Sequence, residues 1–170
     1  MELKTFIRDI PDFPAPGILF RDITPLIGNT VAFEHALMKL ADVIKGVEFD
    51  KIAAIESRGF IFGAPLAKML GKGFIPIRKK GKLPWQTIST SYDLEYGTNE
   101  LEIHKDALEK GEKILIVDDV LATGGTAGAS ARLIEMLGGN VVGFLFLIEL
   151  TFLKGRDALD GHAIYRLIEY

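Results

Sequence analysis

The chain has 170 residues, of which 48% are hydrophobic and 25% are charged, so a disordered chain is excluded. With 20 Lys and Arg against 23 Asp and Glu, the formal net charge is −3, which provides no overall positive field to attract nucleic acid. The absence of cysteine excludes a disulfide framework, a thiol nucleophile and Cys-ligated metal sites.

The length and the apolar runs predict one domain, residues 1–170, in the cytoplasm. A single domain typically has roughly 100–200 residues. Charges interrupt the N-terminal stretch where a signal peptide needs apolar residues. The longest apolar run, 141–148, is far shorter than the roughly 20 residues that a membrane-spanning helix needs. We therefore expect no membrane partner and no nucleic-acid partner.

The first part of the chain is predicted to contain two helices before the first strand. Residues 1–9 suit a short helix, and the Pro-rich and Gly-rich stretch 10–29 suits an irregular apolar loop. Apolar residues then recur at helical spacing over 30–45, with Asn29 or Thr30 as N-cap. The next predicted elements are a strand over Lys51–Ile55, a helix over Phe60–Leu70 that ends at Gly71, and a strand over Gly73–Ile77.

The second part begins with a polar segment, 78–105, whose alternation is typical of a solvent-facing hairpin. The predicted elements after it are strands over Lys113–Val117, 140–148 and Ile164–Ile168, and a helix over about 126–137. Strands that alternate with helices predict an α/β fold, an open and mostly parallel sheet with helices on both faces. Ligands in such folds bind beyond the carboxyl ends of the strands.

Two carboxylates and a Gly-rich turn follow the strand over Lys113–Val117. Asp118 and Asp119 can accept hydrogen bonds from vicinal hydroxyls or help to hold Mg²⁺. Backbone amides of Thr123–Thr126 can converge on an anion at the start of a helix. The lysine of a P-loop and the G-x-G-x-x-G of a dinucleotide site are both absent. The combination predicts a sugar-phosphate site, and the alternative is an ordinary strand-to-helix turn.

Two further strand ends carry residues suited to anions. E-S-R-G-F, residues 56–60, places the Arg58 guanidinium after one strand. R-K-K-G-K, residues 78–82, follows another strand. An Arg in a surface turn and a solvated basic face are the alternatives. Three such ends in one small sheet favour a multiply charged anion.

The segment I-L-I-V-D-D-V-L-A-T-G-G-T, residues 114–126, resembles the phosphoribosyl-diphosphate (PRPP) signature of the type I phosphoribosyltransferase family. Four more segments are similar, in the same order, to the branch of that family that uses adenine. They are G-I-L-F-R-D-I-T-P in a hood over 1–30, E-S-R-G-F in the diphosphate loop, R-K-K-G-K-L-P with 92–104 in a mobile loop over 78–105, and E-L-T-F-L-K-G-R at 149–156.

The resemblance implies transfer of phosphoribosyl from PRPP to N9 of adenine, with Mg²⁺ arriving on PRPP and a homodimeric enzyme. It implies that the 5-phosphate and ribose of PRPP are bound by Asp118, Asp119, Ala122, Thr123, Gly124, Gly125 and Thr126. It assigns diphosphate to Ser57, Arg58, Lys79 and Lys82, and adenine to Leu19, Phe20, Arg21 and Val120. The implied catalytic residues are Glu95, Tyr96 and Arg58.

Two other functions remain open from the sequence. A related transferase for guanine or xanthine would favour a lysine or an acidic side chain near the base, whereas the predicted hood offers backbone groups. A non-catalytic PRPP sensor would need an added DNA-binding segment and a basic surface. Trp85 departs from the family pattern, which has small or polar residues after K-L-P.

Overall fold

The computed structural model describes residues 1–93 and 98–170. The strands are β1 (Arg8–Ile10), β2 (Phe20–Asp22), β3 (Lys51–Ile55), β4 (Gly73–Lys79), β5 (Thr87–Asp93), β6 (Thr98–His104), β7 (Lys113–Leu121), β8 (Asn140–Glu149) and β9 (Ile164–Glu169). The α-helices are α1 (Thr24–Ile27), α2 (Thr30–Val43), α3 (Arg58–Leu70) and α4 (Gly125–Met136). Short 3₁₀ helices are η1 (Leu3–Phe6), η2 (Thr151–Leu153) and η3 (Gly155–Leu159).

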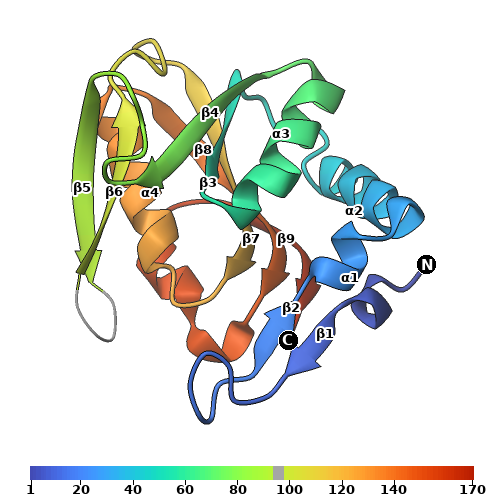
Figure 1. The fold of residues 1–170 in the computed structure, drawn as a ribbon. Coiled ribbons are helices and arrows are strands. Elements are labelled where there is room, and N and C mark those ends of the chain that lie inside the picture. Colours follow the sequence, from blue (N-terminus) through green and yellow to red (C-terminus); the bar gives the residue numbers. More distant parts are fainter. Residues whose placement is uncertain (94–97) are drawn as a thin grey trace.

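Seven strands form one sheet in the order β5-β6-β4-β3-β7-β8-β9 (Figure 1). β4, β3, β7, β8 and β9 run parallel, whereas β6 pairs antiparallel with both β4 and β5. From β3 the chain returns through α3 to β4, and from β7 it returns through α4 to β8 on the other side. The strand order therefore reverses between β3 and β7, which is where open α/β sheets place ligands.

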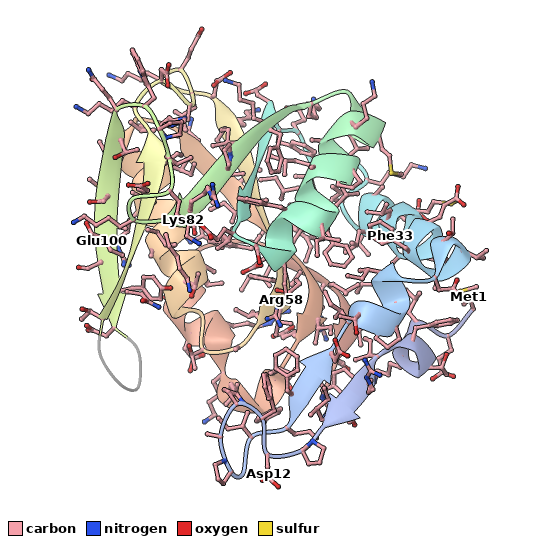
Figure 2. The ribbon with its side chains drawn as sticks, viewed as in Figure 1. Met1, Asp12, Phe33, Arg58, Lys82 and Glu100 are labelled. Carbon is pink, nitrogen blue, oxygen red and sulfur yellow. The ribbon has the colours of Figure 1, made fainter. Side chains whose placement is uncertain are left out.

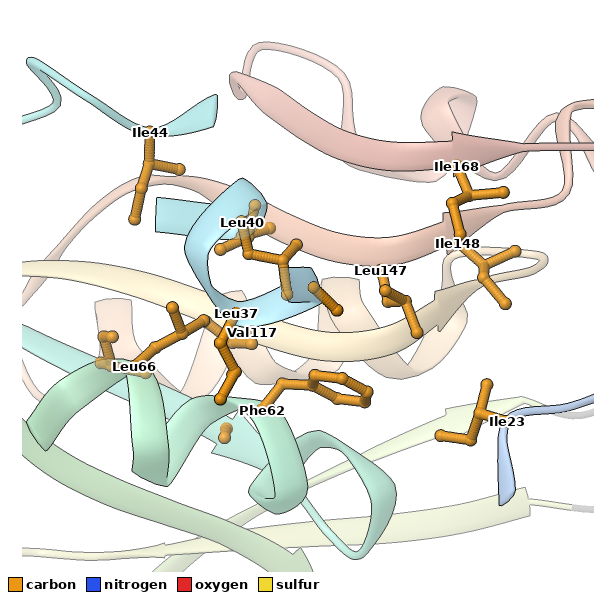
Figure 3. Close-up of a cluster of buried hydrophobic side chains, with 14 of the residues drawn as sticks. Ile23, Leu37, Leu40, Ile44, Phe62, Leu66, Val117, Leu147, Ile148 and Ile168 are labelled. Atoms are coloured by element: carbon orange, nitrogen blue, oxygen red, sulfur yellow. The ribbon is translucent and has the colours of Figure 1, made fainter. Parts of the chain in front are cut away.

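Alternating strand residues divide the core into two apolar layers. Ile52 and Ala54 of β3 pack in the cluster that includes α2 and α3, part of which is shown in Figure 3. Ala53 and Ile55 pack in the cluster that includes α4. Because successive side chains of a strand point to opposite faces, continuously apolar strands require cover on both sides. The predicted α/β fold with helices on both faces is confirmed.

Several predicted elements are confirmed with bounds that differ by few residues. β3 spans the predicted residues, and α2 begins after Asn29, whose Oδ1 accepts a hydrogen bond from the Ala32 amide at 3.0 Å. α3 starts two residues before the predicted Phe60 and ends at Gly71, which adopts the left-handed conformation at φ 64°. Local signals were sufficient here because a cap and a C-terminal glycine act within one turn.

The irregular loop predicted over 10–29 is wrong in part, because β2 and α1 lie within it. β2 pairs with β1, and the buried Asp22 accepts hydrogen bonds from the amide and hydroxyl of Thr24 and from Arg8. The helix predicted over 1–9 is only the 3₁₀ turn η1, followed by β1. Strand pairing and the carboxylate of Asp22 impose an order on this segment that its prolines do not indicate.

The solvent-facing hairpin predicted within 78–105 is correct as a hairpin but wrong in its exposure. β6 joins the edge of the main sheet, so Leu101, Glu102 and Ile103 are buried. β7 also continues four residues past the predicted Val117, which places Asp118 and Asp119 inside the strand. None of the helices formed by residues 1–93 and 98–170 is long and apolar enough to cross a membrane.

Candidate active site

Two adjoining cavities lie beyond the carboxyl ends of β3 and β7. One has a volume of about 560 Å³ and is lined by residues from β3, β4, β5, β6, β7 and the loops that follow. The other has a volume of about 220 Å³ and is lined by Arg58 and the segment from Asp118 to Ala127. Both cavities are lined by Arg58, Asp118, Asp119 and Thr126. Residues from three predicted strand ends therefore meet in one place.

The smaller cavity is enclosed by the turn that joins β7 to α4. Gly124 adopts φ 85°, a conformation that L side chains rarely take, and α4 begins at the next residue. Val120, Ala122, Thr123 and Gly125 line the cavity around it. The first amides of a helix have no partner inside that helix and carry its positive dipole end, so this turn suits an anion.

Two adjacent acids form the floor between the cavities. Asp118 is enclosed but partly accessible, and its Oδ1 accepts a hydrogen bond from the Asp119 amide at 2.9 Å. Burial, followed by the neighbouring Asp119 charge, raises the pKa of Asp118 well above its ordinary value. Burial also raises the pKa of Asp119, although the positive charge of Arg58 opposes it. An acid pair held this way is common at functional sites.

Arg58 connects the acid pair to the N-terminal segment. Its Nε lies 2.8 Å from Asp119 Oδ2, an oxygen without an aligned hydrogen-bond donor among the described residues. Its guanidinium also lies over the Phe20 ring, 5.2 Å from the ring centroid. In Figure 2 Arg58 lies at the start of α3, facing the open centre between the hood strands and the sheet. Arg58 therefore lies where the two cavities adjoin.

The start of α3 approaches β7 very closely because residue 59 is glycine. A Cβ at Gly59 would lie 2.9 Å from Asp118 Oδ1 and 3.0 Å from the Val117 carbonyl oxygen. Contacts under about 3.0 Å are sterically excluded, so only glycine allows this approach. The E-S-R-G segment and the acid pair are thereby brought into direct contact.

Glu56 organises the basic turn on the far side of the larger cavity. Its carboxylate accepts hydrogen bonds from Lys82 Nζ at 2.7 Å, the Lys79 amide at 2.9 Å and Arg78 Nε at 3.2 Å. Burial alone would raise the pKa of Glu56, but these hydrogen bonds, that of Lys82 first, lower it below its ordinary value. Glu56 is therefore ionised and pairs with two cations, Arg78 and Lys82, of whose two positive charges it balances one.

Three of the four cations in the basic run pair with carboxylates among the described residues. Lys80 pairs with Glu100 at 2.8 Å, whereas Arg78 and Lys82 pair with Glu56. Within residues 1–93 and 98–170, the Lys79 ammonium has no carboxylate partner, and the residue lines the larger cavity. Lys79 therefore offers its full charge to an incoming anion.

Some predicted site residues are not brought into the two cavities. Leu19 and Arg21 line neither of them, and the Arg21 guanidinium stacks on the Tyr170 ring at 3.8 Å and pairs with Asp9. Phe20 reaches the site only through Arg58. Glu95 and Tyr96 lie outside the described residues.

Three polar residues that line the larger cavity have no role predicted from the sequence. Glu56 lies inside the E-S-R-G-F segment, so its position at a strand end was a usable signal. Tyr92 and Asn99 face each other across β5 and β6. Their placement depends on the register of that hairpin, and no local pattern indicates it.

A phosphoribosyl transferase domain model matches residues 27–163 of the chain. The adenine phosphoribosyltransferase of Pseudothermotoga lettingae is 59% identical over 170 residues, which are 100% of both chains. The chain belongs to the adenine phosphoribosyltransferase family.

Solved structures of adenine phosphoribosyltransferases match the fold closely. That from Thermoanaerobacter pseudethanolicus is 57% identical, with a TM-score of 0.97 and coverage of 99% of this chain and 98% of its own. That from Saccharomyces cerevisiae, in complex with an imino-altritol bisphosphate and adenine, is 41% identical, with a TM-score of 0.91 and coverage of 96% and 95%. The resemblance stated from five sequence segments is thus confirmed over the whole chain.

Proposed function

We propose that the chain transfers the 5-phosphoribosyl group of PRPP to N9 of adenine and releases AMP and diphosphate. The observation that carries the proposal is the meeting of an anion-binding turn, an acid pair and a cationic loop at the β3–β7 switch point. The bond from the anomeric carbon to diphosphate breaks, and the bond from that carbon to N9 forms. Membership of the adenine phosphoribosyltransferase family supports adenine as the accepting base.

The β7–α4 turn and the acid pair hold the part of PRPP that is transferred. Backbone amides and hydroxyls from Ala122 to Thr126 bind the 5-phosphate at the start of α4. Asp118 and Asp119 accept hydrogen bonds from the ribose hydroxyls. Holding both groups positions the anomeric carbon between the two cavities, which is the main source of rate in such a displacement.

The larger cavity holds the leaving group. Arg58, Ser57, Lys79 and Lys82 surround the position of diphosphate, whose negative charge grows as the bond to the ribose breaks. Lys79 enters this interaction with its charge unpaired among the described residues, whereas Lys82 must first leave Glu56. The remaining positive charge on the sugar is an oxocarbenium-like state that the departing anion helps to stabilise.

Adenine is proposed to lie between Phe20 and Val120. Backbone groups of Leu19 and Arg21 read its edge, which carries one donor and one acceptor. The Arg21 side chain is already engaged by Tyr170 and Asp9, so it leaves the reading of the base to the backbone. Arg58 now stacks on Phe20 and moves toward diphosphate as the base enters.

The acid pair also fits Mg²⁺ that arrives with PRPP. Magnesium prefers a small number of carboxylates together with substrate phosphate oxygens, and Asp119 Oδ2 lacks an aligned donor among the described residues. No group of three His, Cys, Asp or Glu side chains within residues 1–93 and 98–170 is placed to hold a metal by itself. Asp118 and Asp119 would hold the ion jointly with the substrate, and the ion would neutralise charge on diphosphate.

Glu95 with Tyr96 is the proposed acid–base group for the purine N7 proton. The assignment comes from the sequence resemblance. A glutamate with a pKa near the usual 4.3 requires burial to act near neutral pH, which closing of the 78–105 loop would supply. Such closure would also expel water, which would otherwise hydrolyse PRPP.

The domain organisation and the oligomeric state are also proposed from the sequence resemblance. We infer a single domain with a hood over 1–30 and a mobile loop over 78–105, assembled as a homodimer. The 78–105 segment carries the basic turn, and the hood contributes Phe20. A cytoplasmic location remains a prediction from the sequence.

One assay tests the proposed function. The protein is incubated with PRPP, Mg²⁺ and adenine, guanine, hypoxanthine or xanthine in turn, and nucleotide and diphosphate are measured. AMP from adenine is expected, with little product from the other bases. Without AMP the proposal fails, and a preference for an oxo-purine would assign the chain to another base.

Two variants then test the assigned roles. Glu95→Gln is expected to lower kcat by about 100-fold or more while the KM for PRPP changes little, since loss of general acid–base catalysis costs that much. Asp119→Asn is expected mainly to raise the KM for PRPP. Equal losses of kcat and affinity in Glu95→Gln would mean that Glu95 is structural.

A further inference from the structure

The C-terminal segment 149–159 packs against the β7–α4 turn, and a glycine of each segment lies at the contact. A Cβ at Gly155 would lie 2.3 Å from the Ala122 carbonyl oxygen and 2.9 Å from Leu121 Cδ1. A Cβ at Gly124 would lie 2.4 Å from the Gly155 carbonyl oxygen and 2.8 Å from Ala158 Cβ. No side chain fits on either glycine, so two backbones touch there.

Additional contacts keep the same two segments in register. The Leu150 amide donates a hydrogen bond to the Leu121 carbonyl oxygen at 2.9 Å. Leu159, at the end of η3, is buried in the apolar cluster that also contains α4 residues. The segment is therefore attached on both sides of Gly155, to the end of β7 and to α4.

An ion pair to a buried carboxylate fixes the conformation of this segment. Arg156, next to Gly155, donates to Glu149 through Nε at 2.6 Å and through Nη2 at 2.8 Å. The Glu149 side chain is only 4% exposed. Arg166 of β9 approaches the same carboxylate, with Nε 2.9 Å from Oε2. A bidentate pair of this kind sets orientation as well as distance.

The turn needs such support because it binds its ligand through the backbone. Amides that converge on a phosphate must be held within about 0.5 Å of the productive geometry. Gly124 and Gly125 have no side chains that pack and hold the turn from within. Rigidity must therefore come from a neighbouring segment, and 155–158 is the backbone that touches Gly124.

We propose that Gly155 and Arg156 are positioning residues, which with the Glu149 carboxylate hold the 122–126 turn in its phosphate-binding shape. The inference rests on the proposed function, in which that turn binds the 5-phosphate. It gives a role to the 149–156 segment, to which the proposed reaction assigns none. Loss of this support should weaken binding of the 5-phosphate end of PRPP and leave binding of the diphosphate end unchanged.

The test measures binding at the two ends separately by calorimetry, using ribose 5-phosphate as one probe and diphosphate with Mg²⁺ as the other. Arg156→Met is expected to weaken ribose 5-phosphate about tenfold or more, a scale consistent with small misplacements of binding groups. Its Kd for diphosphate should stay within about twofold of wild type. In the assay the KM for PRPP should rise while kcat is largely kept.

Arg166→Met is the matched control, because it removes the other partner of Glu149 without touching the 155–158 backbone. It is expected to lower the Tm but to keep the wild-type Kd for ribose 5-phosphate. Arg156→Lys keeps the charge and is expected to recover part of the affinity. Gly155→Ala should show the same selective loss as Arg156→Met, and if it does not fold, the two Arg156 variants decide the outcome.

The proposal is overturned if Arg156→Met and Arg156→Lys bind ribose 5-phosphate as tightly as wild type. It is also overturned if both probes weaken equally or if Arg166→Met shows the same selective loss. Wild type that binds ribose 5-phosphate but makes no AMP would refute the proposed function alone. Wild type that makes AMP but does not bind ribose 5-phosphate would overturn the positioning proposal alone.

Discussion

At the scale of single residues, Asp118 lines the site but lowers the stability of the folded chain when it is ionised. Burial and the adjacent Asp119 raise its pKa, so the folded chain binds a proton there more strongly than the unfolded chain. Such a group lowers stability as the pH rises above its unfolded pKa of about 4 and through its folded value. The proposed binding of ribose gives a reason for an acid that does not stabilise the fold at neutral pH.

Asp118→Asn is therefore expected to raise the free energy of unfolding at pH 7 to 8 by about 0.5–2 kcal/mol, a usual gain for a single stabilising change. The Asn oxygen can still accept from the Asp119 amide, so the local geometry is kept. Near pH 4 the difference from wild type should shrink, because the acid is then largely protonated. The same variant should raise the KM for PRPP.

Thermal unfolding from pH 4 to 8 measures this effect. Asp106→Asn, at an exposed site, serves as the control and should follow the wild-type curve. If the Tm of Asp118→Asn falls with pH as in wild type, ionisation of Asp118 does not destabilise the fold.

At the scale of elements, α3 uses two glycines for two different purposes. Gly59 brings the first turn of the helix, with Arg58, against Asp118. Gly63 brings the helix body against β3, since a Cβ there would lie 2.6 Å from Ala54 Cβ. One contact shapes the site and the other shapes the core, although both residues are buried glycines of one helix.

Gly59→Ala is expected to lower kcat/KM for PRPP about tenfold or more, because the methyl group displaces Arg58 from the acid pair. Gly63→Ala is expected to lower the free energy of unfolding by about 1–3 kcal/mol through overpacking, with the KM for PRPP unchanged. Steady-state kinetics and denaturant unfolding of the two variants check this separation. Similar kinetic defects in both would show that α3 moves as one body.

The hairpin carries a natural reporter of its own movement. Trp85 is the single tryptophan of the chain and is 65% exposed, and its amide donates to His104 Nε2 at 3.3 Å. The base of the hairpin is thus tied, while the indole remains in solvent. Any closure of the 78–105 segment over PRPP changes the surroundings of this one fluorophore.

Binding of PRPP with Mg²⁺ is expected to shift the emission of Trp85 to shorter wavelength and to reduce its quenching by acrylamide. Ribose 5-phosphate, which lacks diphosphate, should leave the spectrum unchanged, because Lys79 and Lys82 then have no ligand to close over. Fluorescence titration measures both. An unaltered spectrum at saturating PRPP would contradict closure of this segment.

At the scale of the whole molecule, apolar side chains remain on the surface of the single chain. Phe152 and Trp85 are each 65% exposed, and Phe13, Ile18 and Leu19 of the hood are also exposed. The Phe13 amide donates to the Ile18 carbonyl oxygen, so the exposed residues of 13–19 lie together, and contiguous apolar groups commonly mark contacts with other chains. The proposed homodimer would cover part of this surface.

Sedimentation equilibrium at micromolar concentration is expected to give twice the chain mass of 18.7 kDa. Because association hides apolar surface, the Tm should rise with protein concentration. A mass of one chain, with a Tm independent of concentration, would refute the homodimer.

Much of the fold and part of the site could be predicted from the sequence because their signals are local. An apolar run with its flanking cap and glycine predicts β3, α2 and the end of α3. The β7–α4 turn is recognisable because strand, acids and glycines are consecutive. Even there, the predicted strand stops at Val117, whereas β7 continues to Leu121. The sequence does not show that β8 pairs with β7 along these last residues.

The tertiary structure alone decided how separate segments meet. Glu56 pairs with Lys82, which lies 26 residues away in the sequence. Gly155 packs against Ala122, although no helix or strand is predicted for the segment around Gly155. The Tyr92–Asn99 pair depends on strand register in the same way. The sequence by itself determined which groups are suited to an anion, because residue type and local backbone set that chemistry. Which cations stay unpaired, and what holds the phosphate turn, depend on contacts between distant segments, and no local pattern encodes them.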